Sequence, residues 1–143
     1  MPREKIIEVC KNNLAEFKKT LKNETYQNLG IFNSEALLLI SIADYFKVNL
    51  IIESGRARGH STNLLCKFFQ NKSNVKIISL DYKKDENAEH SENILKKYQN
   101  VLLEYGDSRT EIAKHITEDC VVFIDGPKDE DAVHLACQLL KMN

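Results

Sequence analysis

Apolar residues recur at helical spacing near the start of the chain, with lysines between them, and predict an amphipathic helix over residues 3–22. Residues 23–33 are mostly polar and predict a loop. Asn33 or Ser34 is a suitable N-cap for a second helix that extends to about Phe46, with Glu35 in its first turn. Residues 1–48 are therefore expected to contribute two helices.

Short apolar runs alternate with helical patterns over the rest of the chain. The predicted strands cover residues 49–53, 75–80, 101–105 and 121–124, and the predicted helices cover residues 62–69, 89–98, 110–116 and 130–140. Strands that alternate with helices form parallel βαβ units with right-handed crossovers, in a sheet that helices cover on both faces. We therefore expect a single α/β domain over residues 1–143, with its βα units in residues 49–143.

Composition and charge narrow the range of functions that the chain can have. The chain has 143 residues, 43% of them hydrophobic and 29% charged, as is ordinary for one globular domain. A net charge of −1 provides no basic field for nucleic acid. No apolar stretch approaches the ~20 residues that span a bilayer, and the N-terminus does not read as a signal peptide, so we expect no membrane contact and a cytoplasmic location. In that reducing compartment the cysteines are expected to be small buried side chains, with a zinc site or disulfides as the alternative. They are Cys10, Cys66, Cys120 and Cys137.

An acidic residue lies at or just after the end of each predicted strand. These residues are Glu53, Asp81, Asp107 and Asp125. In open parallel sheets, ligands bind outside the carboxyl ends of the strands, near the switch in strand order. The four carboxylates are therefore expected to surround one crevice.

The loop after the first strand contains two glycines. Gly55 and Gly59 permit a tight turn and a close approach of the backbone to a ligand. The loop leads into a helix N-terminus, whose free N–H groups attract anionic groups. Its spacing is G-x-x-x-G, unlike the G-x-G-x-x-G of dinucleotide-binding domains.

Two arginines and a histidine share this loop. Arg56 and Arg58 flank Ala57, and we expect both side chains to point outward. Facing a ligand, they would instead suit a phosphate through charge-assisted hydrogen bonds. That alternative describes a nucleotide- or phosphate-binding α/β domain, although the glycine spacing speaks against it. His60 is expected to be solvated or to cap the next helix.

Together these segments resemble class I S-adenosylmethionine-dependent methyltransferases. Residues 51–62 are similar to motif I of that family, an apolar strand followed by E/D-x-G-x-x-x-G. Ser61 and Thr62 are typical of the branch related to catechol and caffeoyl-coenzyme A O-methyltransferases, and residues 33–35 resemble the start of the helix that precedes motif I there. The resemblance covers residues 34–128, about two-thirds of the chain.

The resemblance implies S-adenosylmethionine as the cofactor and assigns residues to it. Asp81 occupies the position that binds the ribose, and Asp107 the position beside the adenine. The implied cofactor-binding residues are Glu53, Gly55, Gly59, Ser61, Asp81 and Asp107.

On the acceptor side, Asp125 and Lys128 occupy the catalytic positions. In metal-dependent members the aspartate ligates a divalent cation and the lysine removes the proton of the acceptor, and Asp125 is the metal candidate here. An Asp-Asn pair that completes such a metal site lies one βα unit downstream in the family, beyond Asn143. Metal binding is therefore an open alternative, as is a purely solvated Lys128.

The resemblance predicts a Rossmann-like parallel sheet of strand order 3-2-1-4, incomplete beside the seven strands of the family because four are predicted. The expected function is methyl transfer from S-adenosylmethionine to a small-molecule hydroxyl or similar acceptor. The alternative is a truncated, non-catalytic interaction module. In either case the fourth strand is expected to expose an edge through which the chain forms a homo-oligomer.

Overall fold

The computed structural model describes residues 2–26, 30–72 and 74–142. The elements along the chain are α1 (Arg3–Leu21), α2 (Asn33–Phe46), β1 (Leu50–Ser54), α3 (His60–Phe69), β2 (Lys76–Asp81), α4 (Glu86–Leu95), β3 (Val101–Tyr105), α5 (Ser108–Glu111), the 3₁₀ turn η1 (Ile112–Lys114), β4 (Cys120–Ile124) and α6 (Asp129–Leu139). All strand pairs are parallel, in the order β3-β2-β1-β4. The predicted α/β architecture and strand order are confirmed.

The sheet forms because its two central strands are apolar on both faces. Ile51 lies beside Ile77 and Ile52 beside Ile78 in the β1–β2 register, and all but the last of these are fully buried. β-branched side chains favour the extended backbone and pack well on a pleated surface. The next residue pair in this register, Glu53 and Ser79, is polar and equally buried. The interior of the sheet thus turns polar just before its carboxyl edge.

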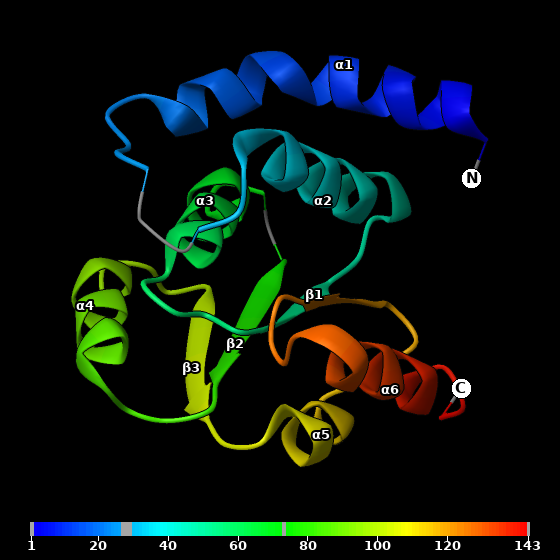
Figure 1. Cartoon of the computed structure of the whole chain (residues 1–143). Coiled ribbons are helices and arrows are strands. Elements are labelled where there is room, and N and C mark those ends of the chain that lie inside the picture. Colours follow the sequence, from blue (N-terminus) through cyan, green and yellow to red (C-terminus); the bar gives the residue numbers. More distant parts are fainter. Residues whose placement is uncertain (1, 27–29, 73, 143) are drawn as a thin grey trace.

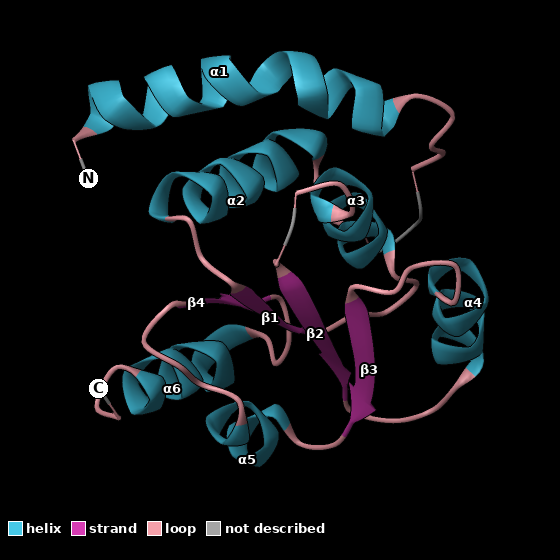
Figure 2. Ribbon diagram, turned by 180° about the vertical axis from the view of Figure 1, so that it is seen from behind, coloured by secondary structure: helices cyan, strands magenta, loops and turns pink. Residues whose placement is uncertain are grey.

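Helices cover both faces of the sheet, and one helix forms an outer layer (Figure 1). α2 and α3 lie on one face, α1 lies across them, and α4 flanks β3. Figure 2 shows α5 and α6 on the opposite face. The larger core lies beneath α2 and α3 and includes Ile40, Leu64 and Phe69, whereas the smaller core joins Ile52 and Leu135.

Several helix starts differ from the sequence prediction by two or three residues. α2 begins at Asn33, and the Glu35 carboxylate accepts the N–H of Phe32 at 2.7 Å, so Glu35 provides the cap expected from Asn33 or Ser34. α4 begins at Glu86 because the Asp85 side chain caps it, accepting two backbone N–H groups. Local capping chemistry, rather than apolar spacing, sets these boundaries.

The cysteines are free, but burial was predicted correctly only for Cys66. Cys10 in α1 and Cys120 in β4 are half-buried, and Cys137 in α6 is exposed. Among the described helices, none combines the length and the apolar character needed to cross a membrane. On the outer side of β4, no described strand continues the sheet.

Candidate functional site

Two adjoining cavities lie at the carboxyl ends of the strands. The larger has a volume of about 920 Å³ and the smaller about 250 Å³. Gly55, Asp81 and Gly126 line both, so the two cavities meet at the ends of β1, β2 and β4. Pockets that hold small molecules are typically ~300–1,000 Å³, so the pair accommodates an elongated ligand.

The larger cavity combines an apolar wall with an acidic rim. Its apolar wall comes from α2, from the segment before it and from the end of β4: Ile31, Phe32, Leu38, Leu39, Ile42, Phe123 and Ile124. Its charged residues are Glu35, Asp81, Asp85, Asp125 and Lys128. Four carboxylates against one ammonium group favour a ligand that is neutral or positively charged.

The glycine loop after β1 is held in a conformation that side chains rarely adopt. Gly55 has φ +94°, and a Cβ atom there would lie 2.6 Å from the backbone nitrogen of Gly126. Gly59 has φ +79° and begins α3, where a Cβ would crowd Ser91. Ala57 also has a positive φ of 45°, which costs a non-glycine residue about 1 kcal/mol.

Asp81 holds this loop and borders both cavities. One carboxylate oxygen accepts the N–H of Ala57 at 2.8 Å and the other accepts the N–H of Tyr82 at 2.8 Å. A carboxylate oxygen has two lone pairs, so each retains the capacity to accept one more hydrogen bond. The side chain therefore fixes the strained loop and can still accept two hydroxyl groups of a ligand.

Glu53 lies beneath the loop rather than in a cavity. The side chain is fully buried and accepts hydrogen bonds from three hydroxyl groups, those of Ser61, Thr62 and, at 2.6 Å, Ser79. Burial raises the pKa of Glu53, and the three hydroxyl groups and the charge of Arg56 oppose that rise. Glu53 and Ser61 thus join β1, β2 and α3 under the loop.

The six residues assigned to the cofactor by resemblance therefore fall into two groups. Gly55, Asp81 and Asp107 line the cavities. Glu53 and Ser61 support the loop from below, Gly59 is the loop residue that precedes α3, and none of the three is among the described residues that line either cavity. Their proposed roles toward a cofactor stay predictions.

Arg56 is turned inward, and its predicted outward orientation is wrong. The residue is 2% exposed. Its Nε donates to the Ser91 hydroxyl at 3.1 Å, and its guanidinium donates to the carbonyls of Ser79 and, at 3.4 Å, Glu104. The guanidinium also lies 4.7 Å from the centre of the Tyr105 ring, at cation–π distance. β2, β3 and α4 together create this buried polar slot, which no local pattern reveals.

The other basic residues of the loop also pack against protein. Arg58 is half-buried and contacts Asn87 and His90 across α4, each at 3.4 Å. His60 is 5% exposed, so its expected solvation is wrong, and its ring packs edge-on against Tyr26 with the centroids 5.0 Å apart. Burial lowers the pKa of His60. None of these cationic groups is among the described residues that line the two cavities.

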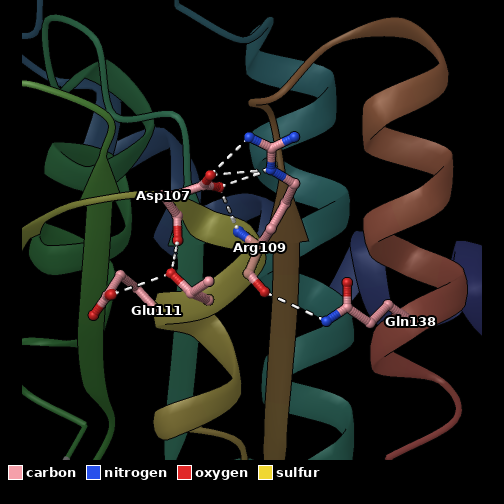
Figure 3. Close-up of polar contacts among 5 residues, drawn as sticks. Asp107, Arg109, Glu111 and Gln138 are labelled. Carbon is pink, nitrogen blue, oxygen red and sulfur yellow. Dashed lines mark hydrogen bonds and ion pairs between the residues drawn. The ribbon is translucent and has the colours of Figure 1, made fainter.

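Asp107 lies in the smaller cavity together with Arg109 (Figure 3). Its carboxylate caps α5 by accepting the Arg109 backbone N–H at 3.0 Å and is also clasped by the Arg109 side chain. The guanidinium keeps the pKa of Asp107 below its usual range. The side chain of Tyr82 lines the same cavity and is largely exposed.

Asp125 and Lys128 lie close together at the mouth of the larger cavity. The Lys128 ammonium donates to the Asp125 carboxylate, and the lysine side chain is 69% exposed. The backbone N–H of Asp125 bonds to the Ser54 carbonyl at 2.8 Å, which places the carboxylate beside the glycine loop. Within the described part of the chain, no cluster of three or more histidine, cysteine or acidic residues has the arrangement of a metal site.

Sequence reasoning missed the cavity wall formed by α2 and also the residues Tyr82 and Arg109. In α2, apolar residues face the core and also the cavity. A second apolar stripe through Leu38 and Ile42, four residues apart, was the available signal. For Arg109, no periodicity indicates that it folds back on Asp107.

Comparison with solved structures identifies the fold. The chain is similar to the SAH-bound methyltransferase PaMTH1 of Podospora anserina, with a TM-score of 0.62 and 18% identity, over 94% of this chain and 62% of that one. It is similar to the O-methyltransferase TomG of Streptomyces achromogenes, involved in tomaymycin synthesis and solved with SAM, with a TM-score of 0.61 and 16% identity, over 88% of this chain and 59% of that one. A protein-L-isoaspartate O-methyltransferase matches with a TM-score of 0.53 and 13% identity, over 86% of this chain and 47% of that one.

These likenesses show that the chain has the Rossmann-like fold of class I methyltransferases. It spans less than two-thirds of the length of these chains. No protein-family model matches the sequence, and no curated protein matches it.

The buried carboxylate of Glu53 predicts a pH-dependent cost of substitution. Because the pKa of Glu53 is raised on folding, its contribution to stability is present below its unfolded pKa of about 4.3 and is lost as the pH rises through the folded value. Glutamine does not ionise, so the Glu53→Gln variant does not undergo this pH-dependent loss of stability. We therefore expect the variant to lose more unfolding free energy relative to wild type at about pH 4.5 than at about pH 8, measured by urea denaturation. A difference that grows with pH would contradict this account.

The two loop arginines predict unequal effects on stability. Arg56→Ala removes a buried side chain and leaves two carbonyls and a hydroxyl without their donor, so we expect a loss of about 2–4 kcal/mol of unfolding free energy. Arg58→Ala is the matched control and should cost at most about 1 kcal/mol, because its contacts are long and half-exposed. Urea denaturation of both variants measures the difference, and equal losses would refute the structural role of Arg56.

Proposed function

We propose that the chain binds S-adenosylmethionine in the two adjoining cavities and that the domain transfers the methyl group to a small-molecule hydroxyl or similar acceptor. The observation that carries this proposal is the pair of cavities that meet at Gly55, Asp81 and Gly126, at the carboxyl edge of a 3-2-1-4 sheet. Ligands of open α/β sheets bind at this edge. The presence of SAH and SAM in the similar structures supports the choice of ligand.

The residues present fit this cofactor. Gly55 lines both cavities, where its lack of a side chain lets the loop pack against Gly126, and Asp81 has spare acceptor capacity for the two ribose hydroxyls. The smaller cavity would hold the adenine, beside Tyr82 and Asp107. The acidic rim of the larger cavity suits a sulfonium cation.

When bound, the cofactor supplies an activated methyl group, so the protein has to align the acceptor rather than perform covalent chemistry. Holding two reactants in line supplies much of the barrier reduction in such a reaction. The apolar wall of α2 would hold an apolar acceptor with its hydroxyl directed toward Asp125 and Lys128. The Asp125 carboxylate would accept the hydrogen bond of that hydroxyl and take up its proton as the methyl group is transferred, and the Lys128 ammonium would donate a hydrogen bond to the hydroxyl oxygen.

The positions of the two loop arginines do not support the alternative of a nucleotide- or phosphate-binding domain. It required Arg56 and Arg58 to face the ligand, whereas Arg56 is buried behind the loop and Arg58 packs against α4. The larger cavity also carries four carboxylates, which would repel a polyphosphate.

Asp81→Ala tests the cofactor site. We expect wild type to bind S-adenosylhomocysteine in isothermal titration calorimetry and the variant to bind at least about tenfold more weakly, because two charge-assisted hydrogen bonds and the anchor of Ala57 are lost. NAD serves as the control ligand.

Asp119→Ala is the matched control variant, because Asp119 is an exposed carboxylate at the opposite edge of the sheet and only its carbonyl is engaged. It should bind like wild type. A folded wild type that binds neither ligand would refute the proposed function.

The open edge of β4 favours a second candidate, assembly with another copy of the chain. β4 pairs with β1 alone among the described strands, and an apolar cavity of about 320 Å³ lies beside it, between β4 and α6. Two identical edges satisfy each other through a two-fold axis. Leu140 lines this cavity and is largely exposed, as are Val133 and Met142 nearby in the sequence.

Leu140→Lys tests this assembly. We expect wild type to be a dimer by light scattering, and the variant to dissociate at least about tenfold more readily because a charge enters an apolar contact. Ile7→Lys on α1, in the outer layer, is the matched control and should leave the dimer unchanged. A wild type that stays monomeric at high concentration would rule the assembly out.

A further inference from the structure

The smaller cavity contains a closed ion pair at the position where the proposed function needs a free acceptor. Asp107 lies where the adenine would bind, yet its carboxylate is already engaged by Arg109 of the same helix (Figure 3). The Arg109 Nε lies 3.0 Å from Oδ1 and 3.1 Å from Oδ2, and its Nη2 lies 2.7 Å from Oδ2. The Arg109 backbone N–H occupies Oδ1 as well, at 3.0 Å.

Both oxygens of the carboxylate are engaged by Arg109. A carboxylate has about four lone-pair sites, and here the backbone N–H reaches Oδ1, the Nη2 group reaches Oδ2, and the single Nε–H is shared between the two oxygens. An amino group that enters the cavity therefore finds Asp107 occupied. Asp81 differs, because each of its oxygens accepts a single hydrogen bond.

We propose that Arg109 is a specificity-determining residue that closes Asp107 and must be displaced before the amino group of an adenine can bind there. This inference rests on the proposed function, since it concerns the same nucleoside site. The Arg109 side chain can move away from Asp107 because it is 55% exposed and the ion pair lies at the surface. Exposed ion pairs contribute little to stability, so breaking this one lowers the affinity for a ligand by at most about fivefold.

Breaking the ion pair between Asp107 and Arg109 does not require α5 to move. Asp107 caps α5 through the backbone N–H of Arg109, and its own carbonyl accepts the Thr110 hydroxyl at 3.0 Å. The contact from α6 also reaches the backbone, because Gln138 donates to the Arg109 carbonyl at 3.4 Å. Only the arginine side chain has to move away from Asp107. The backbone contacts of α5 therefore also persist when that side chain is replaced.

The chemistry of the base makes the effect selective. A freed Asp107 carboxylate accepts a hydrogen bond from a 6-amino purine and repels the carbonyl of a 6-oxo purine. Arg109 acts in the opposite sense, because a guanidinium has donors only. Removing the arginine side chain therefore improves binding of the adenine compound alone.

The experiment measures two ligands against matched variants by isothermal titration calorimetry. The ligands are S-adenosylhomocysteine and S-inosylhomocysteine, which differ at position 6 of the purine. Arg109→Met removes the ion pair with Asp107. Lys114→Met is the control, because Lys114 is an exposed cation in the 3₁₀ turn η1 and pairs with Glu111 instead of Asp107. Both variants lose one positive charge, and circular dichroism checks that each is folded.

We expect Arg109→Met to bind S-adenosylhomocysteine about two- to fivefold more tightly than wild type, and to bind S-inosylhomocysteine no better. Lys114→Met should match wild type with both ligands. Unchanged or weaker binding of S-adenosylhomocysteine by Arg109→Met, or an equal gain for both ligands, would overturn the inference while leaving the proposed function standing. If neither wild type nor Arg109→Met binds S-adenosylhomocysteine, the proposed function itself fails.

Discussion

The site depends on the support of the glycine loop from below. Glu53 draws three hydroxyl groups from β2 and α3 onto one buried carboxylate, and Arg56 ties the loop to β2, β3 and α4. Asp81 then holds the strained Ala57 from the side. Because a buried polar group that loses its partner is costly, removing any one member of these networks weakens the support of the loop. The backbone can therefore keep its positive φ angles and its close approach to Gly126.

Support and ligand contact are thus divided among residues that are neighbours in sequence. Alternate positions of the loop point in different directions, so Gly55 and Ala57 line the cavity while Arg56 enters the protein interior. This division leaves the cavities acidic, although the loop itself contains two arginines. The same arrangement explains how a loop rich in basic residues can serve a positively charged cofactor.

At the other end of the site, Asp107 has a structural role and a proposed role in ligand binding. It caps α5, which keeps the backbone in place, and it is the acceptor that an adenine would use. Its ion pair with Arg109 would compete with the proposed ligand for this carboxylate. In the proposed binding mode, the loop and the ribose position would therefore provide affinity, and the base position would provide selectivity.

The parallel α/β fold class and the acidic residues at the strand ends were predictable from the sequence, because apolar β-branched runs alternate with helical spacing, and the strand order followed from the resemblance to class I methyltransferases. The glycine loop was also predictable, because its residue types and their spacing are local properties of the sequence. The directions of Arg56 and His60, the separation of Glu53 and Ser61 from the cavities, the wall formed by α2 and the closure of Asp107 by Arg109 were decided only by the tertiary structure. Each depends on groups that are brought together from distant elements or on a side-chain rotamer, and periodicity along the chain carries no information about either.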